Sequence, residues 1–321
     1  MTSTKESPFQ TKSVLRIYDG LKKVTPVRVE IISNQSCVAY TNLFIFNAIG
    51  NLKYSVIYDN PVYTTSHDLI LLLKKVKEVC KKNSCIFLEV RLSEHENIHK
   101  GVWEDSSFNY RPWYNAVLVI DSAWPKCISE SKWRNIRVSI DLGYSFGDCE
   151  SLNEIQIVFD IFKEHYRKIN KPIPEKKFFE NIYHEANRKK LNPHSSSELF
   201  VTRHKNQIIA ASVVLISSNT AAQFYFASLT NNKYVHPGSF HQWSMIEWAA
   251  SRNYKWVDLV GGGEPNVNYG VREFKRRFGI KFEEAGRFNL IFKPVHFYFI
   301  KIFLKFMVIL KKLFRTHAIQ F

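Results

Sequence analysis

The sequence predicts a mixed α/β (α+β) fold in two domains, and three observations support this prediction. The chain has 321 residues, which is long for one domain. Short apolar runs of strand length alternate with longer segments whose apolar residues recur at helical spacing. A turn-rich stretch with two glycines at 142–151 separates two halves of similar make-up. We therefore expect a loose leader at 1–14, an N-terminal domain at 15–148, a C-terminal domain at 149–293 and a tail helix at 294–321.

The N-terminal half reads as strands with helices between them. Strands are expected where β-branched and aromatic residues form short apolar runs, as in KYSVIY and CIFLEVR. The segment HDLILLLKKVKEVCKK has apolar residues at helical spacing, with lysines on its other face. The predicted strands are 28–33, 53–58, 85–91 and 115–120, and the predicted helices are 41–49, 67–82 and 129–140, the last with Ser129 as a possible cap.

The C-terminal half opens with helices and continues with a hairpin. A periodic helix is expected at 152–169, and a second after KPIPEKKFF, with Pro174 in its first turn. Lys205 and Asn206 form a tight turn between two strands. The strands expected here are 198–204, 207–216, 221–228, 255–260 and 284–292, and the further helices are 239–252, with Ser239 as its N-cap, and 269–277.

Charge and cysteine content narrow the class of protein. The net charge of +16 and the pI of about 9.5 favour polyanionic partners such as RNA, phosphorylated intermediates or an anionic membrane face. The five cysteines are odd in number and show no CxxC pair, which disfavours a disulfide framework or a structural zinc site. The polar start of the sequence has no apolar core of a signal peptide. These features indicate a cytoplasmic protein with reduced thiols.

A run of three glycines follows the predicted strand 255–260, in the stretch DLVGGGEPNVNYG. It matches neither a Walker loop nor a dinucleotide-binding loop. Glu264 places a negative charge where a phosphate would bind, and Pro265 removes an amide donor. The glycines are therefore read as a strand-to-helix turn, supported by a capping carboxylate. This turn comprises Asp258, Gly261, Gly262 and Gly263.

The order of elements in the second half resembles the GNAT acyltransferases, and in particular their FemAB-like branch. That branch contains peptidoglycan-bridge aminoacyltransferases and relatives from polysaccharide gene clusters. The segments that carry the resemblance are IIAASVVL, AQFYFAS, HPGSFHQWSMIEWAASRNYKWVDLVGGG and GVREFKRRFG, with Gly286-Arg287 after it, over about the last 140 residues before the tail. The first half resembles the family less. The resemblance implies two GNAT-like domains side by side.

The resemblance also implies roles for a Phe-Lys pair. Acyl transfer to an amine passes through a tetrahedral oxyanion, which a fixed cation or amide stabilises. In the family the lysine of this pair plays such an electrostatic role, and the aromatic helps to hold the aminoacyl-RNA end. Carried over, this makes Lys275 the catalytic residue and Phe274 a substrate-binding residue. The alternative is a solvated basic helix face, with Glu273 and Arg277 as an internal ion pair.

Other side chains are candidates for substrate binding from their own chemistry. Glu89 and Arg91 alternate at a strand end, where a guanidinium could bind a phosphate, although an exposed pair at a sheet edge fits as well. Tyr225 alternates with Phe224 and Phe226, so its hydroxyl could face a substrate. The set of substrate-binding candidates is Phe274, Arg277, Tyr225, Arg91, Glu89 and Arg137.

Together these features predict an acyl- or aminoacyltransferase that forms an amide on an amino group of a cell-envelope precursor, either a peptidoglycan stem or an amino sugar. The co-substrate is acyl-CoA or aminoacyl-tRNA, with no permanently bound cofactor and no metal. The pyrophosphate loop of ordinary GNAT enzymes has no match after AQFYFAS. Two alternatives stay open: an acetyl-CoA-dependent sugar N-acetyltransferase, and a non-catalytic protein that binds RNA or an anionic membrane.

The tail at 294–315 is almost entirely large apolar residues and cations, with no acidic residue. On a helix its cations fall within an arc of roughly 120°. This pattern is typical of a helix that lies in a membrane interface, and it favours a peripheral location at the inner face of the membrane. A tilted span or a helix packed on protein are the alternatives.

Overall fold

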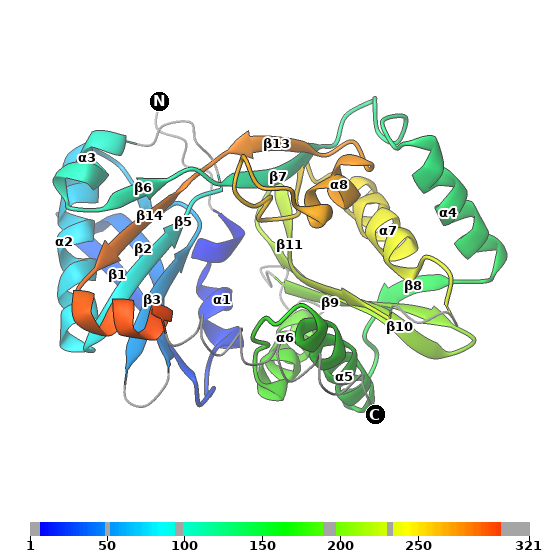
Figure 1. The fold of residues 1–321 in the computed structure, drawn as a ribbon, viewed down its shortest axis with the longest axis horizontal. Coiled ribbons are helices and arrows are strands. Elements are labelled where there is room, and N and C mark those ends of the chain that lie inside the picture. The colour runs from blue at the N-terminus through cyan, green and yellow to red at the C-terminus, as the bar shows by residue number, and fades with distance from the viewer. Residues whose placement is uncertain (1–6, 49–51, 94–98, 189–196, 230–233, 303–321) are drawn as a thin grey trace.

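The structure, a computed structural model, describes residues 7–48, 52–93, 99–188, 197–229 and 234–302. Within these residues the strands form two seven-stranded sheets. The sheets lie side by side, each covered by helices, so the molecule is elongated across the view of Figure 1. This is the mixed α/β fold that the sequence predicts.

The first sheet has the strand order β1-β2-β3-β5-β14-β6, with β4 paired to β2. Its neighbours are antiparallel except β3 and β5, which run parallel because helix α2 connects them as a crossover. The side chain of Thr65 caps α2 by accepting a hydrogen bond from the amide of Asp68. The elements of this half are η1 (Pro8–Gln10), α1 (Lys12–Ile17), β1 (Val24–Ser33), β2 (Ser36–Asn47), β3 (Lys53–Tyr58), β4 (Val62–Tyr63), α2 (Ser66–Lys82), β5 (Cys85–Arg91), α3 (Lys100–Asp105), β6 (Asn109–Arg111) and β14 (Arg287–Ile291).

The second sheet has the order β13-β7-β12-β11-β10-β9-β8. Only β11 and β12 run parallel, and helix α7 connects them. The elements of this half are β7 (Tyr114–Val119), α4 (Glu130–Asp141), β8 (Ser145–Asp148), α5 (Leu152–Lys168), α6 (Lys176–Arg188), β9 (Ser197–His204), β10 (Gln207–Ile216), β11 (Thr220–Ser228), α7 (Pro237–Ser251), β12 (Trp256–Asp258), α8 (Gly270–Arg276) and β13 (Lys281–Glu284).

Strand β10 is buried on both faces of the second sheet. Val213 and Leu215 pack in the core that α5 and α6 cover. Val214 and Ile216 pack in the opposite core, beneath α7. Figure 1 shows α5 and α6 below β9 and β10, with α7 and α4 on the other side. This strand is nearly all apolar because neither of its faces meets water.

The two sheets exchange strands across the expected domain boundary. Strands β7 and β8 precede residue 149 but lie in the second sheet, and β14, near the end of the described chain, lies between β5 and β6 in the first. Segment η1 also joins the halves, because the ring of Phe9 packs 5.1 Å from Phe224 and 6.0 Å from Tyr58. The boundary at 148/149 stays a prediction.

Most of the predicted elements are confirmed. The strands at 53–58 and 85–91 match β3 and β5, and the helices at 67–82 and 152–169 match α2 and α5 to within one residue at either end. Lys205 and Asn206 both have positive φ angles, 47° and 63°, as the predicted two-residue hairpin turn requires.

The helix expected at 41–49 is wrong, because residues 41–47 belong to strand β2; residue 49 lies outside the described residues. Leu43 pairs with Val27 on one side and Ile57 on the other. Leu43 and Phe44 point into different cores, so the segment is apolar on both faces. A strand buried on both faces has no alternation, and its sequence cannot be distinguished from that of a short buried helix.

Two further predictions need correction. The strand expected at 284–292 corresponds to β14 at Arg287–Ile291, but its first residue, Glu284, is the last of β13, which lies in the other sheet. The chain crosses between them at Gly286, whose φ is +84° and where a Cβ would lie 2.3 Å from the ring of Tyr110. Helix α7 begins at Pro237 after an N-cap at His236, so Ser239 lies in the first turn and is not the cap.

Candidate functional site

The parallel strands β11 and β12 separate at the centre of the second sheet. They pair only from Thr220 opposite Trp256 to Ala222 opposite Asp258. A bulge at Phe224 follows on β11, and the strand continues to Ser228. Beyond Ala222 this edge of β11 has no strand partner among the described residues. Side chains of α5 occupy part of this edge, because the backbone groups of Phe226 and Ser228 hydrogen-bond with Tyr166 and His165.

The three glycines continue β12 as a bridge to β7. The amide of Gly262 donates to the carbonyl of Tyr114 at 2.7 Å, and the amide of Tyr114 donates to the carbonyl of Gly263 at 2.8 Å. A Cβ on Gly262 would lie 2.7 Å from the ring of Phe282. The φ of Gly263 is +82°. Close packing and backbone conformation thus account for Gly262 and Gly263 without a phosphate.

Lys275 is buried beneath this turn. Its Nζ donates to the carbonyl oxygens of Leu259, Val260 and Gly261, at 2.6, 2.9 and 3.0 Å. Burial lowers the pKa of Lys275 to about 8, and the charge of Asp258 opposes that shift. An ammonium group has three donors, and all three are taken. The amino group of Lys275 is thus directed into the turn.

Asp258, at the end of β12, supports the same turn. Its Oδ1 accepts from the amide of Val260 at 2.6 Å, and its Oδ2 accepts from the side chain of Asn115 at 3.1 Å. Burial, together with the charge of Asp59, raises the pKa of Asp258 to about 6. These contacts are those of a capping carboxylate.

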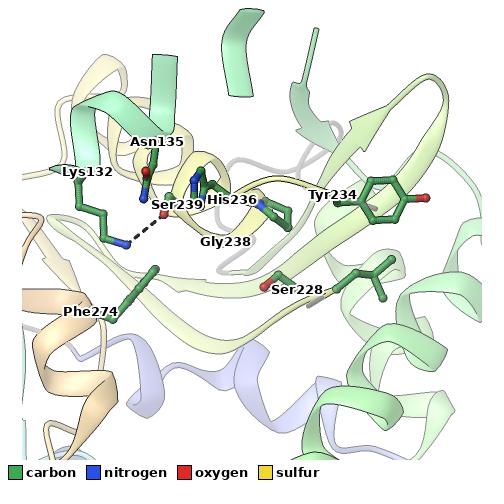
Figure 2. A pocket seen from close by; sticks show the side chains of 10 residues that line it. Lys132, Asn135, Ser228, Tyr234, His236, Gly238, Ser239 and Phe274 are labelled. Carbon is green, nitrogen blue, oxygen red and sulfur yellow. Dashed lines mark hydrogen bonds between the residues drawn. The ribbon is translucent and has the colours of Figure 1, made fainter. Parts of the chain in front are cut away.

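A pocket of about 390 Å³ opens where α4, α7 and α8 approach the end of β11. Figure 2 shows Lys132, from α4, with its amino group between Ser239 and the ring of Phe274. Gly238 permits a close approach of α7 to β11, because a Cβ there would lie 3.1 Å from the hydroxyl of Ser228. The lining residues are Lys132, Asn135, Ser228, Leu229, Tyr234, His236, Pro237, Gly238, Ser239 and Phe274.

Lys132 is the buried cation of this pocket, with 7% of its surface exposed. Its Nζ donates to Ser239 Oγ at 3.1 Å and lies 4.1 Å from the ring centroid of Phe274. Burial, with a contribution from Arg277, lowers the pKa of Lys132 to about 8. No ion pair of Lys132 with a carboxylate occurs within the described residues. A buried ammonium group that retains free donors is suited to bind an anion.

A second group of charged residues lies in the first sheet. Glu89 pairs with Arg91 at 2.5 Å and with Arg287 of the neighbouring strand β14 at 3.2 Å. Burial acts to raise the pKa of Glu89, but the two guanidinium groups lower it below its usual value. Strand β5 is internal to the sheet, so this is not an exposed pair at a sheet edge.

The other predicted site residues are scattered. Tyr225 lies among aromatic rings, 5.6 Å from Phe178 and 5.9 Å from Tyr166, and burial raises its pKa well above 10. Arg277 forms the expected ion pair with Glu273, at 3.1 Å, on the exposed face of α8. Arg137 is exposed on α4 and does not line the pocket.

Neither Lys132 nor Arg287 was among the site residues expected from the sequence. Lys132 lies four residues before Ile136 and seven before Ser139, all buried on one face of α4. A lysine on the apolar stripe of the predicted helix was a signal that could have been used. Arg287 comes directly after the glycine at the crossing between the sheets, and no periodicity marks it.

Comparison with known proteins supports the fold, and part of the chain matches a family model. Residues 150–305 match the model of the FemAB family. Among solved structures, FemX aligns with a TM-score of 0.70 at 12% identity, covering 92% of this chain and 95% of FemX. A tandem GNAT protein from the clavulanic acid biosynthesis pathway aligns with a TM-score of 0.57 at 8% identity, covering 90% of each chain. L-PGS from Bacillus licheniformis aligns with a TM-score of 0.56 at 11% identity, covering 79% of this chain and 83% of L-PGS. No curated protein matches the sequence.

The fold is therefore that of the tandem GNAT-like proteins, with two GNAT-like units side by side. Residues 150–305 are similar to the FemAB family, and the likeness to FemX and the tandem GNAT protein is one of fold. Within the described residues, no helix is long and apolar enough to cross a membrane, and no group of three or more His, Cys, Asp or Glu side chains could hold a metal ion.

Proposed function

We propose that this protein is an acyl- or aminoacyltransferase that forms an amide on an amino group of a cell-envelope precursor, a peptidoglycan stem or an amino sugar. The observation that carries the proposal is the separation of β11 from β12 beside a pocket in which the buried Lys132 donates to Ser239 and has no carboxylate partner among the described residues. The match to the FemAB family and the likeness to FemX support this class of reaction.

The acyl donor binds with a phosphate near Lys132. Both coenzyme A and the 3′ end of a tRNA carry phosphates, so the donor is acyl-CoA or aminoacyl-tRNA. Lys132 supplies a charged donor, and the N-terminus of α7, a helix of 15 residues, adds the positive end of its dipole. Phe274 forms a wall of this pocket and positions the donor.

The acceptor amine attacks the carbonyl carbon of the ester or thioester, and the leaving alcohol or thiol takes a proton as the bond breaks. Negative charge develops on the carbonyl oxygen in between. Lys275 stabilises this charge through the peptide groups that it holds. No side chain at the turn is free to act as a base, since Asp258 is buried and bonded on both oxygens. The amine therefore loses its proton to water or to the substrate. Contacts to the acyl acceptor or the acyl donor are also proposed for Arg91, Glu89, Tyr225, Arg137 and Arg277.

The tail helix suggests where in the cell the protein acts. Residues 294–302 are helical, and 303–321 lie outside the described residues. The ring of Phe297 packs 5.0 Å from Phe87 of the first sheet. A separate stripe at helical spacing is exposed, with Val295, Tyr298, Phe299 and Ile302 each between 53% and 80% exposed. With the cations and the lack of acids in the remaining sequence, we propose that this stripe binds an anionic membrane surface, where lipid-linked precursors occur.

The test is a transfer assay read by intact mass. Aminoacyl-tRNA and acetyl-CoA are each offered with amino-sugar and peptide-stem acceptors. Lys132→Met should raise the KM for the donor at least about tenfold, because a charge-assisted hydrogen bond is lost. Lys126→Met, which changes an exposed lysine in the turn before α4, should leave the KM for the donor unchanged. Absence of transfer for every combination, from protein that is folded, would refute the proposal and favour a protein that only binds RNA or membrane.

A further inference from the structure

Two buried N–H donors near the glycine turn have no acceptor. They are Nε1 of Trp113 and Nε of Arg287, and neither finds a hydrogen-bond partner among the described residues. The guanidinium carbon of Arg287 lies 3.6 Å from the indole centroid of Trp113, so the two side chains are stacked. Buried donors are seldom left without a partner, because their loss of water is not compensated. Two together indicate a missing acceptor.

Gly261 leaves room for that acceptor. A Cβ built on Gly261 would have one described heavy atom within 4 Å apart from its chain neighbours, and this atom is Nε1 of Trp113 at 3.5 Å. A ligand oxygen in that space would come within reach of the indole N–H. Gly261 does not have a positive φ, so its backbone does not require glycine.

The backbone amide of Gly261 is a third donor beside this space. No hydrogen bond of this amide is formed within the described part of the chain. The carbonyl of the same peptide group, that of Val260, accepts a bond from Lys275 at 2.9 Å. In a trans peptide the N–H and the C=O point in opposite directions. The amide therefore points away from Lys275, and the bound ammonium group strengthens it as a donor.

The surrounding charge favours an anion. Arg91 and Arg287 share the single carboxylate of Glu89, so positive charge exceeds negative charge by one in this group. Burial lowers the pKa of Arg287, but only to about 10, so it stays charged at neutral pH. The side chain of Arg91 is 40% exposed, and it opens the group to solvent.

The position of these residues separates them from the donor pocket. Trp113 lies between β6 and β7, and its carbonyl accepts from the amides of Ala285 and Gly286 between β13 and β14. Both connections between the sheets thus meet at Trp113. The pocket around Lys132 instead lies among α4, α7 and α8, and shares no lining residue with this group.

We propose that Trp113, Gly261 and Arg287 bind an oxyanion of the substrate that accepts the acyl group. This oxyanion is a phosphate or a carboxylate oxygen that lies in the space beside Gly261. That this anion belongs to the acyl-accepting substrate rests on the proposed function, whereas the existence of the anion site does not. All three groups are N–H donors, so the ligand must supply hydrogen-bond acceptors, which a cation does not. An ether oxygen would accept a hydrogen bond but would not balance the excess positive charge of the group, whereas an oxyanion does both.

Calorimetric titration tests the site with inorganic pyrophosphate and, in a second arm, succinate, which distinguish a phosphate from a carboxylate ligand. The protein carries Lys132→Met, so that the donor pocket does not contribute. We expect one of the two probes to bind. Trp113→Phe should weaken it about tenfold, the effect of losing one hydrogen bond to a charged group, and Gly261→Ala should weaken it at least about tenfold, because its methyl group fills the space for the oxyanion. Gly270→Ala is the matched control, since a Cβ there has no described neighbour within 4 Å, and it should bind as the parent does.

Equal binding by Gly261→Ala, Trp113→Phe and the control would overturn the site, as would failure of both probes to bind the parent. Thermal melts of each variant establish that it is folded, and Gly261→Ala keeps the test valid if Trp113→Phe does not fold. If the probes bind as expected but no amide is formed in the transfer assay, the proposed function fails while the anion site stands.

Discussion

The amino group of Lys275 donates a hydrogen bond of 2.9 Å to the carbonyl oxygen of Val260, across the turn between β12 and α8. With two further bonds to Leu259 and Gly261, it fixes the backbone at the point where β12 leaves β11. The residue that the family resemblance marks for catalysis is thus also a structural residue. Because a substitution at Lys275 changes stability as well as activity, both must be measured.

Lys275→Met should lower the free energy of unfolding by about 3 kcal/mol, because three buried carbonyls lose their donor. Urea denaturation measures this. Arg276→Met removes a neighbouring cation that is 59% exposed and should cost less than about 0.5 kcal/mol. A stable Lys275→Met protein that has lost only its transfer activity would mean that the ammonium group serves the reaction without supporting the turn.

Gly262→Ala should destabilise the protein by about 1–3 kcal/mol, the usual cost of an added methyl in a packed site. Its Cβ would lie 2.7 Å from the ring of Phe282 and 2.9 Å from Cβ of Tyr114. Chemical denaturation gives the change. Gly270→Ala, at the first residue of α8, should be neutral or stabilising by up to about 1 kcal/mol. Equal stability of the two variants would show that the turn relaxes around the methyl group.

Binding of sulfate at Lys132 should weaken as the pH rises above about 8. The pKa of Lys132 is lowered to that value, so its positive charge is complete below it and is lost as the pH passes through it. The dissociation constant should rise about tenfold between pH 8 and pH 9.5. The pKa of His236 is also lowered, so this side chain is neutral throughout. Sulfate keeps its charge over this range.

The sulfate titration is done with Gly261→Ala protein, so that the space beside Gly261 is filled. Lys132→Met in the same protein should bind weakly and without this pH dependence. A pH profile that survives Lys132→Met would assign the titration to another group.

Phe299→Asp combined with Ile302→Asp should reduce binding to phosphatidylglycerol vesicles at least about tenfold, since each apolar side chain contributes roughly 1.5–3 kcal/mol when buried. Co-sedimentation measures it, with phosphatidylcholine vesicles as the uncharged comparison. Ile32→Asp changes an exposed apolar residue on β1 that is 59% exposed and should have no effect. Unchanged sedimentation of the double variant would exclude this stripe as the membrane contact.

The sequence predicted the elements with clear periodicity and the family from its motifs, but it did not predict which strands pair. Helix α5 and strand β5 show their patterns locally. The placement of β14 between β5 and β6 depends on contacts between residues about 200 positions apart, which no local pattern records. The segment at 41–49 was misread for the same reason, since only its partners on both sides show it to be a strand.

In the site, too, local motifs could be predicted from the sequence and long-range contacts could not. The Phe-Lys pair and the glycine turn were visible as motifs. Lys132 meets Phe274 only because α4 and α8 pack against each other, 142 residues apart in the chain. The direction of the Lys275 side chain follows from the path of the backbone at 259–261, which sequence spacing does not determine.

The exchange of strands has a consequence for synthesis and for dissection of the chain. Because β14 fills the place between β5 and β6, the first sheet is incomplete on the ribosome until residue 291 has emerged, and until then β5 and β6 each present an open edge. A fragment that ends at residue 148 lacks β14, and one that begins at 149 lacks β7 and β8. The two GNAT-like units are therefore interdependent in folding, and neither half is a self-sufficient fragment for expression.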